Sequence, residues 1–98
     1  MAGVKFQLVH PEGKSAPRID QWKYDTVRSV LLAIIPADEQ GIPFAGLDQR
    51  VTAALAPDQV TRIGSIGWYM THVKLDLEAR GEIERVPGSS PQRLRRTS

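Results

Sequence analysis

The stretch that decides the fold is GWYMTHVKLDLEARGEIERV, residues 67–86. Turning each residue by ~100° about a helix axis brings its apolar side chains into one sector, so we expect a helix from Ser65, its N-cap, to about Arg80. Gly81 follows as the stop, because glycine adopts the left-handed conformation that ends helices. The expected core residues of this helix are Ile66, Tyr69, Met70, Val73 and Leu77.

After Gly81 the chain reads EIERV, then PGSSP, then QRLRRT. Two short apolar-containing segments around a Pro/Gly/Ser turn predict a β-hairpin over residues 82–97. Ile83 and Leu94 are the residues that we expect to point inward.

Two more helices are predicted upstream. Asp20 or Asp25 caps the first, and Pro36 ends it. The second spans about Gly46–Ala56 and is closed by Pro57, so that residues 57–64 form a connection. A short extended piece lies around Ile42–Phe44. The inward residues expected for these two helices are Val27, Val30, Leu31, Ile34, Ile35, Leu47, Val51, Ala54 and Leu55.

The N-terminal segment VKFQLV, residues 4–9, places Val4, Phe6 and Leu8 at alternate positions, which predicts a strand with one buried face. The Pro- and Gly-rich HPEGKSAPR that follows predicts a loop or an extended arm.

Three helices followed by a two-stranded wing are the winged helix-turn-helix arrangement. We therefore expect a mainly α fold with a small β-hairpin, in one domain over residues 1–98. An N-terminal strand and arm would occupy residues 1–23, a three-helix core residues 24–80 and the wing hairpin residues 82–97.

The composition fits a soluble globular chain, with 98 residues, 41% apolar and 24% charged side chains and no cysteine. The absence of cysteine excludes disulfides and thiolate metal sites, and we expect a cytoplasmic protein. No segment has the length of a membrane span or the pattern of a signal peptide. The net charge is +2, but residues 80–98 carry five arginines against two glutamates, so the basic charge gathers at this end.

The string from Trp68 through Val73 to Gly81, followed by Ile83 and Arg85, resembles a family of small uncharacterised bacterial proteins. Members of that family pair a "GWW…TVQLDLEAKG" helix with a C-terminal "PLRW"-like strand. The matching positions here read GWYMTHVKLDLEARG and PQRL, residues 91–94. The resemblance covers most of the chain and implies a winged-helix fold, but it brings no established activity. Arg95 stands where the family's strand has an aromatic residue.

No constellation of residues predicts catalysis. The two histidines, His10 and His72, have no second metal-type ligand beyond Asp76, one helical turn after His72. We therefore expect a non-enzymatic binding protein with no metal, no cofactor and no small-molecule substrate.

Double-stranded DNA is the leading partner, because the fold and the basic wing agree. Phosphate contacts require arginine or lysine, and we assign them to wing residues, with Arg62 joining near the start of the last helix. Thr71 and Lys74 on that helix would lie nearest the bases. The assigned wing residues are Arg85, Arg93, Arg95 and Arg96.

The alternative is a protein-interaction or dimerisation module. Opposite its core sector the last helix presents Trp68 and Leu75, an apolar pair that suits a contact surface better than a DNA groove. The N-terminal arm, with Phe6, Leu8 and Trp22, would cover this face within one chain or in a homodimer, where two copies exchange their arms.

Overall fold

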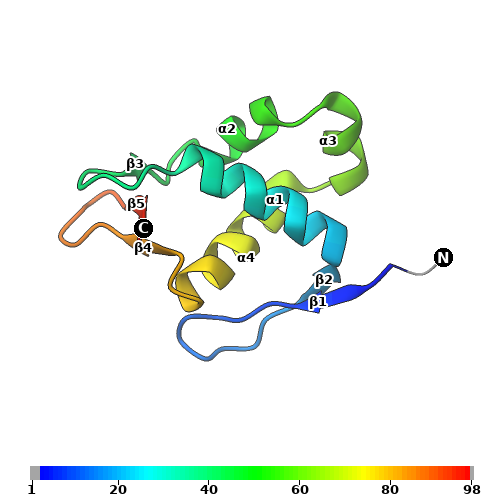
Figure 1. Ribbon diagram of the computed structural model, residues 1–98, viewed down its shortest axis with the longest axis horizontal. Coiled ribbons are helices and arrows are strands. Elements are labelled where there is room, and N and C mark those ends of the chain that lie inside the picture. The colour runs from blue at the N-terminus through cyan, green and yellow to red at the C-terminus, as the bar shows by residue number, and fades with distance from the viewer. Residues whose placement is uncertain (1–2, 98) are drawn as a thin grey trace.

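Helices α1 (Gln21–Ile34) and α4 (Ile66–Ala79) form the centre of the molecule in the computed structural model, which describes residues 3–97 (Figure 1). The two helices pack against each other through the apolar stripes that the sequence predicts. Tyr69, expected in the core, is only half-buried. The side chains buried between the helices and their neighbours are Val27, Leu31, Ile35, Met70, Val73 and Leu77.

Helix α1 begins at Gln21, earlier than the expected three-helix core at residue 24. Asp20 is its N-cap residue, but the Asp20 carboxylate accepts a hydrogen bond from Lys5 Nζ at 2.6 Å and makes no side-chain cap. The first turn of α1 therefore contains Trp22 and Lys23, which the sequence had left to the arm.

The connection predicted at residues 57–64 is wrong, because a helix forms there. Helix α2 (Leu47–Ala54) is followed at once by α3 (Pro57–Ile63). Proline suits the first position of a helix, where its missing N–H is not needed. Gln59 Oε1 accepts the N–H of Ala56 at 2.9 Å and closes the first turn. Ala54, expected inward, is exposed.

Helix α4 stops where the sequence predicts. Gly81 has φ 76°, and its N–H donates to the carbonyl of Glu78 at 3.1 Å. The N–H of Glu82 reaches back to the carbonyl of Leu77 at 2.9 Å. This left-handed cap turns the chain directly into the hairpin.

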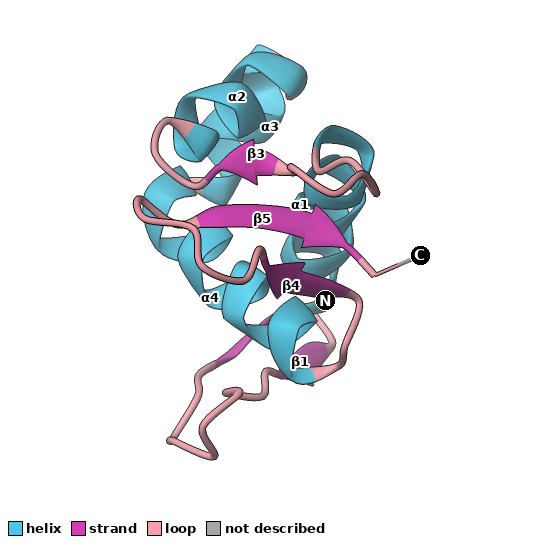
Figure 2. Cartoon of the chain, turned by 90° about the vertical axis from the view of Figure 1, so that its left-hand side faces the viewer, coloured by secondary structure: helices cyan, strands magenta, loops and turns pink. Residues whose placement is uncertain are grey.

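The hairpin consists of β4 (Ile83–Arg85) and β5 (Arg93–Arg96), and β3 (Ile42–Pro43) adds to the free side of β5 (Figure 2). The resulting antiparallel sheet has the order β3-β5-β4. Ile83 and Leu94 are buried, as predicted. Gly41 has φ 61°, and a Cβ there would lie 2.1 Å from the Leu94 carbonyl oxygen, so glycine is required for β3 to approach β5.

The N-terminal arm folds as a second, two-stranded sheet in which β1 (Lys5–Gln7) pairs antiparallel with β2 (Arg18–Asp20). Leu8 and Ile19 are buried in the same core as α1 and α4. Val4, expected on the buried face, precedes β1 and is 70% exposed, so this expectation is wrong. The arm lies beside the start of α1, whereas the wing lies at the other end of the long axis (Figure 1).

The mainly helical class with a small hairpin is confirmed. None of the helices within residues 3–97 has both the length and the apolar composition needed to cross a membrane.

Candidate interaction surface

The wing arginines are bound to their own chain. Arg85 Nε lies 3.1 Å from Glu78 Oε1, and Arg95 Nε lies 2.6 Å from Glu84 Oε2. Arg93 donates to the backbone carbonyls of residues 40 and 41 at 2.7 and 3.0 Å. Arg96 donates to the carbonyl of residue 35 at 2.7 Å. The four predicted phosphate-binding residues of the wing therefore bind groups of their own chain and tie the sheet to neighbouring elements.

Lys74, predicted beside the bases, is buried, so its expected exposed position is wrong. Its side chain is 4% exposed, and its Nζ lies 2.8 Å from Glu78 Oε2. The Phe44 ring covers the amine, with 4.9 Å between Nζ and the ring centroid. Burial lowers the pKa of Lys74, against the opposing effect of Glu78. Thr71, the other predicted base contact, is half-buried.

Trp68 remains at the surface. It is 43% exposed and stands at the N-terminal end of α4. Its ring lies 4.9 Å from the Tyr69 ring, edge to face, and 4.3 Å from the His72 ring. Leu75, its predicted apolar companion, is half-buried. The exposed apolar character of this face is therefore concentrated in Trp68 rather than spread along the helix.

Two cations lie against aromatic rings near this end of α4, one on Trp22 and one on Tyr69. The guanidinium carbon of Arg62, at the end of α3, lies 4.7 Å from the Trp22 ring centroid. Lys23 Nζ lies 4.7 Å from the Tyr69 ring centroid and donates to Tyr69 Oη and to the Ile63 carbonyl, each at 3.2 Å. Lys23 Nζ also lies 5.7 Å from the Trp22 ring centroid, so these contacts are linked to one another, and we call the group the aromatic–cationic surface. Its residues are Trp22, Lys23, Arg62, Trp68, Tyr69 and His72.

Three elements hold the aromatic–cationic surface in place. The first turn of α1, the last turn of α3 and the first turns of α4 meet at the end of the molecule opposite the wing (Figure 1). Sequence reasoning singled out Trp22, Trp68 and Arg62, but it assigned Tyr69 to the core and did not use Lys23. The sequence feature that could have indicated this surface is the presence of two tryptophans in a chain with little other aromatic content. Their convergence depends on α3, which was not foreseen.

The arm residues predicted for the interface pack inside the chain instead. The Phe6 ring stacks on Tyr24 with 4.0 Å between centroids, and Leu8 is 2% exposed. The N–H of Val9 donates to Asp76 Oδ1 at 2.9 Å. Within one chain the arm thus contacts α4 at Asp76 and Arg80. It does not cover Trp68, so the prediction that the arm covers the face of Trp68 and Leu75 within one chain is wrong for Trp68.

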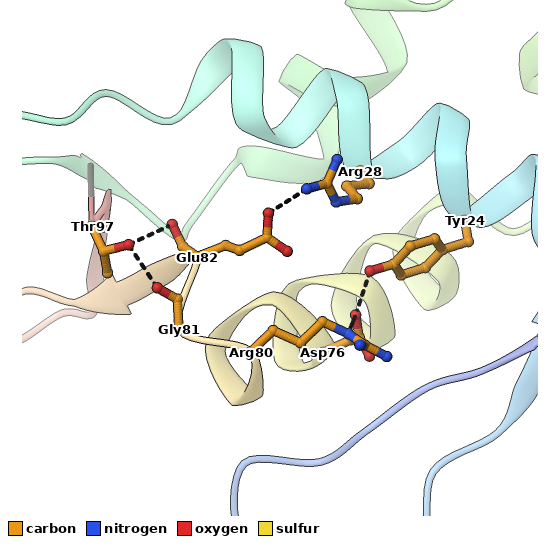
Figure 3. A network of polar contacts seen from close by, with 7 residues as sticks. All are labelled: Tyr24, Arg28, Asp76, Arg80, Gly81, Glu82 and Thr97. Atoms are coloured by element: carbon orange, nitrogen blue, oxygen red, sulfur yellow. Dashed lines mark hydrogen bonds and ion pairs between the residues drawn. The ribbon is translucent and has the colours of Figure 1, made fainter.

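Asp76 is the centre of a polar network that joins the arm, α1 and α4, and Figure 3 shows its contacts with Tyr24 and Arg80. Its carboxylate is fully buried and accepts the Tyr24 hydroxyl at 2.7 Å and Arg80 Nε at 2.9 Å, in addition to the Val9 amide. Burial, followed by the hydrogen bond to Asp76, raises the pKa of Tyr24. Nearby, Arg28 pairs with Glu82, which ties α1 to the chain leaving α4.

The resemblance seen in the sequence is now supported by a comparison with protein-family models. The model of a family of unknown function, DUF6958, matches residues 5–94. The chain belongs to this family. The match spans the arm, all the helices and most of the wing, so the DUF6958 region includes the aromatic–cationic surface. No curated protein and no solved structure matches the chain.

The side chains of this DUF6958 protein do not assemble a metal site within residues 3–97, where no three His, Asp or Glu residues come together suitably. Asp76 was the only metal-ligand partner predicted for His72, but its carboxylate accepts hydrogen bonds from Tyr24 and Arg80 instead. His72 belongs to the aromatic–cationic surface through its contact with Trp68.

Proposed function

We propose that this DUF6958 protein is a non-enzymatic winged-helix protein that binds another protein through the aromatic–cationic surface. The observation that carries the proposal is the exposure of Trp68. Trp68 is 43% exposed and contacts Tyr69, which is linked through Lys23 to Trp22 and Arg62. This group has the composition of a binding hot spot, in which Trp, Tyr and Arg predominate.

Rigidity also supports this surface as a binding site. Trp68 is held by Tyr69 and His72, and Arg62 is held by Trp22. A side chain already ordered before binding loses less conformational entropy when a partner arrives. The surface is therefore suited to bind without rearranging.

The order of the elements supports the winged-helix part of the proposal. Along the chain, α1 is followed by the short strand β3, then by the helices α2 to α4, and then by the β4–β5 hairpin. The short strand β3 joins the hairpin on the β5 side. In this arrangement α4 would be the recognition helix and β4–β5 the wing.

A photo-crosslinking experiment tests the proposal directly. The amino acid p-benzoylphenylalanine replaces Trp68, which keeps an aromatic side chain in place, and in a matched variant it replaces the exposed wing residue Arg85. After irradiation of cells that make the protein, we expect an adduct from position 68 that protease destroys and nuclease does not. An adduct from position 85 alone, or none from either position, would refute the assignment of this surface.

Duplex DNA is the second candidate, and the winged-helix order of the elements favours it. The pairing of the wing arginines argues against it, because Arg85 and Arg95 already pair with Glu78 and Glu84. The partly exposed Arg95–Glu84 pair is weak and can open, whereas Glu78 is 10% exposed and also pairs with Lys74. Duplex titration at low and moderate salt decides the matter, since phosphate binding weakens steeply with salt. Salt-sensitive binding that is lost with Arg85→Ala would favour DNA.

A further inference from the structure

The two cations of the aromatic–cationic surface have no acidic partner. Within residues 3–97, neither Arg62 nor Lys23 has a carboxylate oxygen within 4.0 Å, whereas Arg28, Arg80, Arg85 and Arg95 each have one. Ring faces and neutral oxygens hold Arg62 and Lys23 instead. Their positive charge is therefore held in place without a salt bridge among the described residues.

The hydrogen-bonding capacity of both cations is also incompletely used. A guanidinium that lies against an indole face keeps its N–H donors around its edge, where a carboxylate can accept two of them in parallel. Arg62 is exposed and makes no hydrogen bond among the described residues. Lys23 uses two of the three donors that an ammonium group carries, on Ile63 and Tyr69.

We propose that the partner segment bound by the aromatic–cationic surface is acidic. In this inference, which rests on the proposed function, a carboxylate pairs with Arg62, a second approaches Lys23, and an apolar side chain of the same segment packs on Trp68. The inference follows from charge complementarity, because the two cations of the surface have no salt-bridge partner among the described residues.

A nucleic acid fits the same surface less well. Asp58 stands one helical turn before Arg62, Asp25 stands one turn beyond Trp22, and both are exposed. A continuous phosphate backbone would meet these two carboxylates, whereas a peptide can place its own carboxylates between them. Two cations are also few beside the roughly 6–10 phosphate contacts of a typical DNA-binding protein.

Peptide selection tests the inference without assuming a partner. A random peptide library, displayed on phage, is selected on the immobilised full chain, and binders that the Trp68→Ala variant also retains are removed. We expect the remaining peptides to be rich in Asp and Glu next to Leu, Phe or Trp. Synthetic versions are then titrated into the protein. Trp22 and Trp68 are the only two tryptophans, so their emission reports binding at this surface.

Variants give the expected size of the effect. Arg62→Ala should weaken the binding of a selected peptide, measured by fluorescence anisotropy, by about 10–100-fold, the range for a lost charge-assisted pair. Arg62→Lys keeps the charge but not the planar fork, so it should weaken binding less than Arg62→Ala. The matched control Arg85→Ala should leave the affinity unchanged.

The outcomes separate this inference from the proposed function. Peptides that need Trp68 but are neutral or basic would overturn the acidic partner and leave the interaction surface standing. Failure to select any Trp68-dependent peptide would count against both. Tighter binding of a mixed-sequence oligonucleotide than of every selected peptide would show that the anion is phosphate. Self-association in light scattering that Trp68→Ala abolishes, without acidic peptides, would identify the partner as a second copy.

Discussion

Replacing Asp76 by asparagine should strongly destabilise the protein. The carboxylate is fully buried and accepts hydrogen bonds from Tyr24 Oη at 2.7 Å, Arg80 Nε at 2.9 Å and the Val9 amide at 2.9 Å. Asp76→Asn preserves the volume, so no cavity forms. It removes the negative charge and puts an NH2 group where one of the donors points.

The magnitude follows from the donors left behind. A buried polar group without its partner costs about 1–3 kcal/mol, and the loss of one member of a buried ion pair costs about 3–5 kcal/mol. Arg80 is 36% exposed and regains water, which reduces the second cost. We therefore expect a loss of about 3 kcal/mol in the free energy of unfolding. For a domain of this size the melting temperature should fall by roughly 12–24 °C.

Urea unfolding followed by circular dichroism at 222 nm measures the change. Asp25→Asn is the matched control, because Asp25 lies exposed on α1 and accepts none of these donors. Amide hydrogen exchange locates the effect, and we expect the Val9 amide to lose protection more than the amides within α1. A loss below about 1 kcal/mol, or one equal to that of the control, would refute the account of Asp76 as the anchor of the arm.

Three further predictions concern other parts of the chain. Gly41→Ala should lower the free energy of unfolding, measured in urea, by at least ~2 kcal/mol more than Gly13→Ala. Both glycines have positive φ, but only at Gly41 would a Cβ meet the Leu94 carbonyl. Equal losses would contradict the close approach. Folded Tyr24 keeps its proton above pH ~10 and the unfolded chain loses it, so stability should fall with rising pH there by up to ~1.4 kcal/mol per pH unit. That part of the slope should be absent in Tyr24→Phe, and an unchanged slope would argue against a buried phenol. Glu78→Gln leaves the buried Lys74 amine without its carboxylate partner and should cost about 3 kcal/mol in the same assay. It should cost more than Lys74→Met, which leaves Glu78 paired with Arg85. The reverse order would show that Lys74 is not buried as a charge.

The apolar periodicity was sufficient to locate α1, α2 and α4 and most of their core residues. Four of the five expected core residues of α4 are buried, and Gly81 ends the helix as predicted. These features depend on neighbours within a turn or two, which is the range that a sequence pattern describes. Helix α3 was missed because a proline can end one helix and begin the next, and Pro57 does the second.

The site was less predictable because its contacts cross long stretches of sequence. The sequence places Asp76 on the surface of an amphipathic helix, but Tyr24 of α1, 52 residues earlier, and Val9 of the arm, 67 residues earlier, lie against it. The sequence pattern predicts Lys74 as a solvent-facing cation, but in the fold the Phe44 ring covers it. Trp68 was recognised as unusual from its place on the helix. Its neighbours Lys23 and Arg62 arrive from α1 and α3, and no local pattern indicates that.

The junction between the arm and the helical body limits how two copies can associate. Strand β2 ends at Asp20 and α1 begins at Gln21, so no hinge residues separate them. A domain-swapped dimer needs a hinge that opens into an extended segment. Here that segment would have to come from the first turn of α1, and unwinding it would displace Trp22 and Lys23. Any dimer that keeps the aromatic–cationic surface is therefore expected to form from closed protomers, each with its own arm in place.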